Sequence, residues 1–171
     1  MTEARLKAAY SQYRDPLFRF GYRLTGSVEA AEDAVHDSFI GLFNGGFDES
    51  RASLKTYLFA AVRNQVRKRL RDYSREDQDA EVEEIAATTP LDIVISEETA
   101  SAVQNAVAAL PVAQREVLVL FEYEELSLEE IARIAEIDAG AVKSRLFRAR
   151  AALRKLLCAS LARPAVKEPS R

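Results

Sequence analysis

The chain has 171 residues, with 24 Lys and Arg against 27 Asp and Glu, so its formal net charge is −3 and its pI is near 5.4. Those totals argue against a uniformly basic nucleic-acid-binding protein. A single cysteine, Cys158, excludes an internal disulfide, and a single histidine, His36, would have to carry any histidine-based metal or catalytic site alone.

No apolar run approaches the roughly 20 residues that a membrane helix needs, and the N-terminus has no signal-peptide core. We therefore expect a cytoplasmic protein without membrane insertion, and we expect no cofactor and no metal. Only six glycines and five prolines occur, while Ala, Leu, Glu and Arg dominate, a composition that favours helices. No stretch alternates polar and apolar residues for long enough to indicate a sheet. The sequence predicts an all-α protein.

Residues 4–23 carry apolar side chains at spacings of three and four, which is typical of one or two amphipathic helices. If there are two, Pro16 fits the first turn of the second. Ser27 can cap the next helix, with Glu29 near its positive end, and Asn44 with two glycines ends it. The expected inward stripe of that helix consists of Val28, Ala31, Val35, Phe39 and Leu42. Outside the stripe lie Glu32, Asp33, His36 and Asp37, which the pattern alone describes as a solvated acidic face.

The next predicted helix covers residues 53–71 and buries Leu54, Leu58, Ala61, Val62, Val66 and Leu70. Its opposite side gathers Tyr57, Asn64, Arg67, Lys68 and Arg71. A solvated basic face needs neither an aromatic ring nor an amide. Nucleic-acid bases, by contrast, stack on tyrosine and hydrogen-bond to asparagine, while their phosphates pair with arginine. The pattern therefore favours nucleic-acid contact over a solvated face.

Opposite charges are segregated along the sequence. Residues 51–75 hold eight basic side chains and one acidic one, a net +7, whereas residues 76–98 hold nine acidic side chains and no basic one, a net −9. Residues 143–155 hold six basic side chains and no acidic one, a net +6. Such blocks imply separate surfaces with different partners. The acidic stretch is also poor in large apolar residues, so we predict a flexible linker there, either a functional tether or a solvated loop.

The C-terminal part predicts a helix over residues 97–110 and another with Pro111 in its first turn. This second helix is expected to bury Val112, Val117, Leu118, Leu120 and Phe121. Ser127 and Glu130 have the spacing of a capping box at the start of a third helix, which is expected to bury Leu128, Ile131, Ala132 and Ala135.

The final predicted helix has the apolar stripe Val142, Leu146, Ala149, Leu153 and Leu156. Projecting away from this stripe are Lys143, Ser144, Phe147, Arg148, Arg154 and Lys155. Two short helices joined by a tight turn, the second of them basic, predict a helix-turn-helix whose second helix enters a major groove. The alternative is a solvated basic helix in a bundle.

Three segments give the chain a family resemblance: AAEDAVHDSFIGLF, LKTYLFAAVRNQVRKRLR and LPVAQREVLVLFEYEELSLEEIARIAEIDAGAVKSRLFRARAALRKL. In this order they resemble the small extracytoplasmic-function (ECF) group of bacterial sigma-70 factors, which are promoter-specificity subunits of RNA polymerase. The resemblance implies two small helical domains joined by a flexible acidic linker, the C-terminal one a helix-turn-helix. Residues 1–75 would bind core polymerase and recognise and melt the minus-10 element, 76–98 would be the linker, 99–160 would recognise the minus-35 element, and 161–171 would be a tail. It implies no enzymatic activity.

The resemblance also assigns roles to residues. Asp33, His36 and Asp37 would bind the clamp coiled coil of core polymerase, while the outer apolar surface of the helix-turn-helix would dock on the flap. The unpaired minus-10 strand would be held by Tyr57, Asn64, Arg67, Lys68, Arg71 and, from the preceding loop, Phe47. Asn64 and Phe47 would form a pocket for a flipped base. The minus-35 duplex would be read by Lys143, Ser144, Phe147 and Arg148. An anti-sigma factor is a further expected partner.

The sequence departs from the family pattern at several positions. Tyr57 replaces a common Trp, and His36 stands where relatives often have Gln. Glu136 occupies a turn position where the family prefers Gly, which would cost about 1 kcal/mol if a left-handed conformation is required there. Asp138 and Ala141 replace the usual Pro and Thr; Asp138 can still cap the recognition helix.

Other functional classes fit less of the sequence. A stand-alone transcriptional regulator would leave the acidic helix and the Tyr57–Asn64–Arg67 face without a use. A sigma mimic that occupies an anti-sigma protein can lose the basic side chains that contact DNA. This sequence keeps both of its basic blocks, residues 51–75 and 143–155. An enzyme would need a carboxylate–histidine, nucleophile–base or phosphate-loop arrangement, and the sequence shows none.

Overall fold

The computed structural model describes residues 2–45, 47–76 and 98–162, and these residues form seven α-helices and no strand. The all-α prediction is confirmed. Most of the predicted linker 76–98 and of the predicted tail 161–171 lies outside the described residues. The helices are α1 (Glu3–Thr25), α2 (Val28–Phe43), α3 (Leu54–Glu76), α4 (Glu98–Ala108), α5 (Val112–Glu122), α6 (Leu128–Ala135) and α7 (Ala139–Leu161).

The first predicted segment is one helix, because α1 runs through Pro16 without a break. It ends at Gly26, whose φ of 67° is left-handed and whose N–H donates to the carbonyl of Tyr22. Helix α2 begins as predicted, since the Ser27 side chain accepts a hydrogen bond from the Ala30 N–H at 3.2 Å. The expected burial of Val28 is wrong: this side chain is 53% exposed, because the first residue of α2 precedes the part of the helix that packs on α1.

Helix α3 extends five residues past the predicted end, to Glu76, and buries Leu58, Val62 and Val66 as expected. Together α1, α2 and α3 form the N-terminal half of the molecule. At its centre the ring of Phe20 on α1 meets the ring of Phe59 on α3 edge-to-face, with ring centroids 5.4 Å apart.

Helices α4 to α7 form the C-terminal half, in which the long α7 packs against α4, α5 and α6. Pro111 lies at the N-cap of α5, one residue before the predicted first turn. The capping box of Ser127 and Glu130 is present at the start of α6, and Asp138 caps α7 by accepting from the Ala141 N–H at 2.9 Å. The expected burial of Leu156 is wrong; it is 37% exposed and lies in the C-terminal part of α7, where side chains beyond Ala149 are no longer fully buried.

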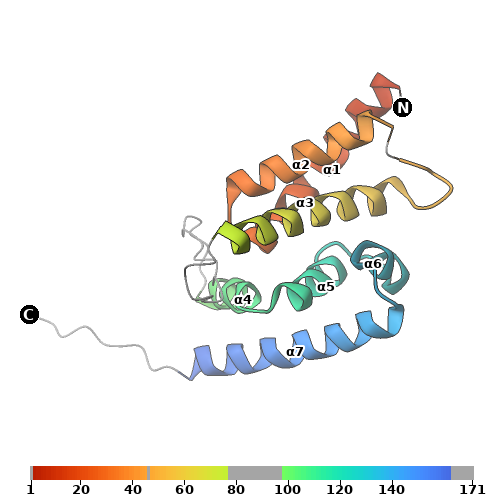
Figure 1. The fold of residues 1–171 in the computed structure, drawn as a ribbon. Helices are drawn as coiled ribbons and strands as arrows, with labels where there is room; N and C mark the ends of the chain where they lie inside the picture. Colours follow the sequence, from red (N-terminus) through yellow and green to blue (C-terminus); the bar gives the residue numbers. More distant parts are fainter. Residues whose placement is uncertain (1, 46, 77–97, 163–171) are drawn as a thin grey trace, which may run out of the picture.

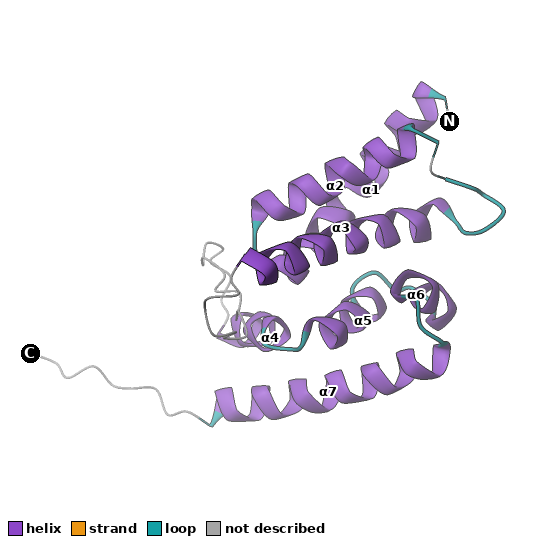
Figure 2. Cartoon of the chain, viewed as in Figure 1, coloured by secondary structure: helices purple, strands orange, loops and turns teal. Residues whose placement is uncertain are grey.

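The two halves pack against each other. In Figure 1 α1 and α2 lie uppermost with α3 beneath them, α4, α5 and α6 form a middle row, and α7 lies below. Figure 2 shows the same succession, with loops confined to the ends of the helices. Helix α3 contacts α6, and α1 contacts α5. As a result, the buried apolar side chains of both halves form one continuous cluster.

Candidate functional site

The predicted nucleic-acid face of α3 is largely open to solvent. Asn64, Lys68 and Arg71 are exposed, and Tyr57 is partly exposed. Arg67, by contrast, lies at the edge of this face and turns toward the C-terminal half, where its side chain retains 35% of its exposure. The structure therefore brings four of the five residues together on an accessible surface. The fifth, Arg67, contacts the C-terminal half instead.

An aromatic pair stands at the N-terminal end of this face. The rings of Phe47, in the loop before α3, and Tyr57 have centroids 5.2 Å apart, at an interplanar angle of 51°. Gly41 on α2 lies beneath the tyrosine: a Cβ at this position would sit 3.7 Å from the Tyr57 hydroxyl. Phe47 and Tyr57 are thus neighbours, as a shared role in base contact requires, and both keep part of their surface exposed.

Two arginines of α3 hold one carboxylate of α5. Glu116 is completely buried and accepts hydrogen bonds from Arg63 and from Arg67, the latter at 2.7 Å between Nη2 and Oε2. Arg63 is 5% exposed and also donates to the carbonyl of Ala135 at 3.0 Å. We call Arg63, Arg67 and Glu116 the Glu116 triad. All three charged groups are paired, which burial in a protein interior demands.

Arg115, the residue before Glu116, makes a second polar link between the halves. Its guanidinium donates to the carbonyl of Leu24 at the end of α1 at 3.1 Å. It also donates within its own half to the carbonyls of Ala108 and Leu110, at 2.5 and 2.8 Å. Burial lowers the pKa of Arg115 from its ordinary value. The fork of a guanidinium suits this position because its several donors can face carbonyls on two sides at once.

Neither Arg63, Arg115 nor Glu116 was among the residues singled out by the sequence. A signal for Glu116 does exist, since it stands four residues before Leu120 and so shares the apolar face of its helix. A charged residue on an apolar face requires a buried partner. The identity of that partner depends on how the two halves meet, and periodicity carries no information about that.

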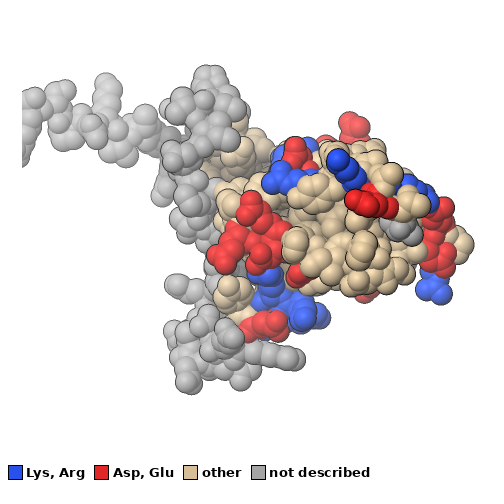
Figure 3. All heavy atoms as spheres, turned by 90° about the horizontal axis from the view of Figure 1, so that it is seen from above, with Lys and Arg blue, Asp and Glu red and all other residues tan. Residues whose placement is uncertain are grey.

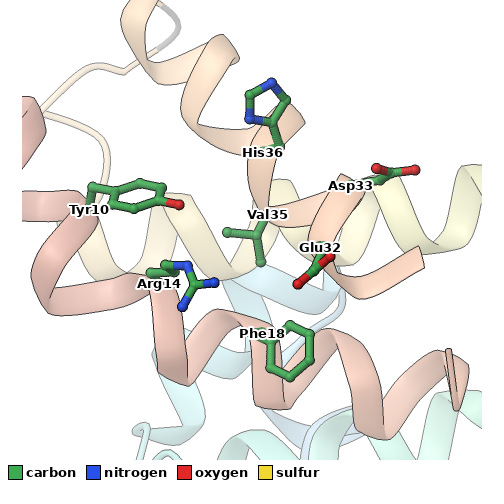
Figure 4. Close-up of a pocket in the computed structure, with 7 residues that line it drawn as sticks. All are labelled: Tyr10, Arg14, Phe18, Glu32, Asp33, Val35 and His36. Carbon is green, nitrogen blue, oxygen red and sulfur yellow. The ribbon is translucent and has the colours of Figure 1, made fainter. Parts of the chain in front are cut away.

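The predicted polymerase-binding residues lie on α2. His36 and Asp37 are exposed, and Asp33 is partly covered because it pairs with Arg69 on α3 at 2.8 Å. Beside them, an open pocket of about 270 Å³ lies between α1 and α2, and Figure 4 shows it in close-up. Its lining residues are Tyr10, Arg14, Phe18, Glu32, Asp33, Val35 and His36. The pocket therefore joins acidic side chains to aromatic and apolar ones.

The outer surface of α1 and α2, like the pocket, combines acidic side chains with aromatic and apolar ones. Figure 3 views the molecule from this side and shows acidic side chains gathered beside a broad uncharged area. Large apolar residues contribute to the exposed surface of these helices: Tyr10, Val28, Ile40 and Phe43, the last with 66% of its surface exposed. Exposed apolar residues bordered by charges are typical of a surface that binds another protein.

In the C-terminal half, α6 and α7 form the predicted helix-turn-helix. The turn passes through Glu136, whose φ of 57° and ψ of 42° are left-handed, so the conformation that favours glycine is present. On α7, Lys143, Ser144, Phe147 and Arg148 are all exposed, while Val142 and Leu146 point into the core. Phe147 has 75% of its surface exposed, so its ring is accessible to a partner molecule.

Within the described residues, no group of three or more His, Cys, Asp or Glu side chains is placed to hold a metal ion. None of the described helices combines the length and apolar character that crossing a membrane requires.

Comparison with known proteins finds a matching family for each half of the molecule. Residues 9–76 match the family Sigma-70 region 2, and residues 100–153 match the family Sigma-70, region 4. The chain is 34% identical over 159 residues to the ECF RNA polymerase sigma factor SigW of Bacillus subtilis, with 85% of this chain and 84% of that protein covered. The chain belongs to the ECF RNA polymerase sigma factors. It is also 32% identical over 149 residues to SigM of Mycobacterium tuberculosis, covering 86% of this chain and 74% of that protein.

Solved structures share the fold of this sigma factor. The sigma factor RpoE of Bartonella quintana, determined in complex with the anti-sigma factor NepR, aligns with a TM-score of 0.73 at 26% identity, covering 89% of this chain and 96% of that one. CnrH, determined with the cytosolic domain of CnrY, aligns with a TM-score of 0.68 at 22% identity, covering 92% of this chain and 90% of that one. The second likeness concerns the fold alone.

Membership of this family settles the general function. The protein is a sigma factor that directs promoter-specific initiation of transcription, and its helix-turn-helix belongs to region 4. This identity makes it a regulatory protein of transcription.

Proposed function

We propose that α3 and α7 bind two different forms of promoter DNA. The α3 face, with Tyr57, Asn64, Lys68 and Arg71, would hold the unpaired strand of the minus-10 element, because it combines a ring for stacking, an amide for base edges and cations for phosphates. Phe47 would extend the stacking surface from its place beside Tyr57. Arg67 would join this site once its bond to Glu116 is released.

The exposed side of α7 would read the minus-35 element as duplex. Lys143 and Arg148 can contact phosphates or the acceptors of guanine, Ser144 can bond to either, and Phe147 can contact a thymine methyl group. Asp138 keeps the N-terminus of α7 capped, which allows this end of the helix to enter the groove in a defined orientation. Under this assignment residues 1–75 and 99–160 act as two DNA-binding domains, joined by the acidic segment 76–98.

The surface of α2 would bind core RNA polymerase. Asp37 and His36 are exposed beside the pocket between α1 and α2, and Ile40 and Phe43 add apolar area along the same helix. Asp33 is shared between this surface and Arg69, so we assign it a smaller part in the contact. The flap of the polymerase would take the outer surface of the helix-turn-helix.

We further propose that an anti-sigma factor controls the protein, since RpoE of Bartonella quintana, with a TM-score of 0.73, was determined with one. The protein would act in the cytoplasm as a non-catalytic subunit. The observation that carries the proposal is the presence of two separate exposed faces, on α3 and α7, in the halves that match regions 2 and 4.

The test is transcription in vitro with core polymerase on a library of promoters. Asn64→Ala combined with Lys68→Ala should abolish strand opening, read as permanganate reactivity of unpaired thymines, while leaving core binding unchanged. Lys7→Ala, which removes an exposed cation of α1, serves as the control. Equal loss of opening and of core binding would contradict a nucleic-acid role for the α3 face. A wild-type protein that binds duplex DNA but directs no start site would contradict the proposal as a whole.

A further inference from the structure

Basic side chains make the polar contacts between the two halves. Besides the Glu116 triad, Lys55 on α3 donates to the carbonyl of Glu124 at 3.0 Å, and the guanidinium of Arg23 on α1 lies 4.0 Å from the ring centroid of Tyr123. Arg115 donates to the carbonyl of Leu24. In each of these contacts a cation of one half meets an acceptor or an aromatic face of the other. The only side-chain carboxylate among these acceptors is that of Glu116.

The Glu116 carboxylate binds the α3 arginines as a phosphate would. Its two oxygens are divided between them: Oε1 accepts from Arg63, and Oε2 accepts from both Nε and Nη2 of Arg67, at 3.2 and 2.7 Å. Charge-assisted hydrogen bonds of this kind, from guanidinium N–H groups to anionic oxygens, hold phosphate as well as carboxylate. Arg67 belongs to the proposed minus-10 site, so one side chain has two anionic partners that exclude each other.

A contact of this kind can be exchanged. When two charged groups separate from a buried pair, water solvates both of them, and this solvation offsets most of the attraction that is lost. An apolar interface has no such compensation, because its opening exposes hydrocarbon to water. The Glu116 triad therefore contributes less to the free-energy difference between the closed and the open arrangement than apolar side chains would at the same place, beside the apolar cluster that also spans the two halves.

We propose that Glu116 makes an autoinhibitory contact: it occupies Arg63 and Arg67 in the closed molecule and yields them to the phosphates of an unpaired nucleic-acid strand. This regulation rests on the proposed role of α3. In the closed form Nε and Nη2 of Arg67 are occupied by Glu116 and do not bind a phosphate, and the same contact ties the C-terminal half to α3. Binding of a strand releases both constraints together, so strand capture and separation of the halves are coupled.

The closed and open forms can be distinguished in the free chain, without polymerase or promoter. Cys158, exposed on α7, takes one spin label, and Ser11→Cys, exposed on α1, takes a second. Pulsed dipolar electron spin resonance then reports the distance between the two halves. In this doubly labelled background, Glu116→Gln removes the charge and keeps the shape, and Glu116→Lys places a third cation beside the two arginines. Glu122→Gln, on the same helix but paired with Arg150 inside the C-terminal half, is the matched control.

We expect Glu116→Gln and Glu116→Lys to lengthen and broaden the distance distribution, while Glu122→Gln leaves it unchanged. Circular dichroism of each variant establishes that the helices persist. A thymine-only oligonucleotide should lengthen the distance in the otherwise wild-type chain as well, which tests the exchange without any change at Glu116. If the open form is a minor state of roughly 10% or less, Glu116→Gln should bind this oligonucleotide about tenfold more tightly or better.

An unchanged distance in both Glu116 variants would overturn the autoinhibitory contact, whatever happens in transcription. A lengthened distance in the variants, without any effect of the oligonucleotide on the wild type, would overturn the exchange with nucleic acid. The proposed function fails by a different result, the absence of a directed start site with core polymerase. The two failures are therefore distinguishable.

Discussion

Arg67 on α3 and Glu116 on α5 are joined by two hydrogen bonds, of 2.7 and 3.2 Å, although 49 residues separate them in sequence. The glutamate is completely buried, whereas the arginine keeps 35% of its side-chain exposure. The pair therefore spans the boundary between the proposed DNA-binding face and the interface of the two halves. A substitution at either residue is therefore expected to change the hydrogen bonding of the other.

We predict a coupling free energy of about 1–3 kcal/mol between Arg67 and Glu116, measured by a double-mutant cycle of Arg67→Gln and Glu116→Gln in urea unfolding. The reason is that Glu116→Gln leaves two arginines without their carboxylate, while Arg67→Gln leaves the buried Glu116 with Arg63 as its remaining cation. The cycle of Arg150→Gln and Glu122→Gln provides the control, because this ion pair is about half exposed, with side-chain exposures of 48% and 46%. Its coupling should stay below about 1 kcal/mol. Equal coupling in the two cycles would contradict a special role for Glu116.

Arg115→Lys should destabilise the protein by about 2 kcal/mol, as expected when hydrogen bonds to a charged donor are lost. One ammonium group cannot reproduce the fork that reaches Leu24 in one half and Ala108 and Leu110 in the other. The measurement is the midpoint of urea unfolding followed by circular dichroism. Arg133→Lys, at an exposed position of α6, should leave the midpoint unchanged.

Glu136→Gly should stabilise the helix-turn-helix by about 1 kcal/mol, because Glu136 holds a left-handed conformation that glycine adopts without strain. The backbone N–H of residue 136 keeps its bond to the carbonyl of Ala132 in the variant. Arg133→Gly, inside α6, should instead destabilise by a similar amount, since glycine is a poor helix former. Thermal unfolding of both variants measures the difference. If both changes were destabilising, the turn would not be strained at this position.

The local features of this fold were predictable because they depend on neighbours in sequence. The caps at Ser27, Ser127 and Asp138 follow from one side chain and the N–H groups within three residues of it. The helical wheel likewise predicted that Asn64 and Lys68 would be exposed. The prediction that Val28 is buried was wrong because a residue at the end of a helix need not reach the surface on which that helix packs.

The interface between the halves was not predictable in the same way. Arg63 and Arg67 are four residues apart, so their side chains differ by only about 40° around α3. Helical periodicity therefore places Arg67 at the edge of the basic face. Its partner in the structure, Glu116, lies on another helix, α5. Which carboxylate would meet it depends on the packing of α3 against the C-terminal half, a property that no single segment contains.

Glu124→Gln should increase stability above pH 4.5 and change little below it. Burial raises the pKa of Glu124 above its ordinary value of 4.5, against the lowering effect of Arg19, Lys55 and Arg23. The folded chain therefore prefers the protonated form, and stability is lost as the pH rises through 4.5 toward the raised pKa. Urea unfolding at several pH values measures the effect. Glu125→Gln, the same exchange at the exposed neighbouring position, is the matched control.

Lys143→Ala and Arg148→Ala should both weaken binding to minus-35 duplex DNA, and the salt dependence tells which contact each side chain makes. A cation that pairs with a phosphate releases counterions, so its loss lowers the slope of log K against log salt by about 1 and weakens all sequences alike. A cation that reads a base edge instead costs about 1–3 kcal/mol at one position of the site and relaxes specificity there. Binding of each variant to matched and single-substituted duplexes at several salt concentrations separates the two cases. Arg133→Ala, an exposed cation on the first helix of the motif, is the control, and an equal effect of all three changes would indicate general electrostatic attraction rather than recognition by α7.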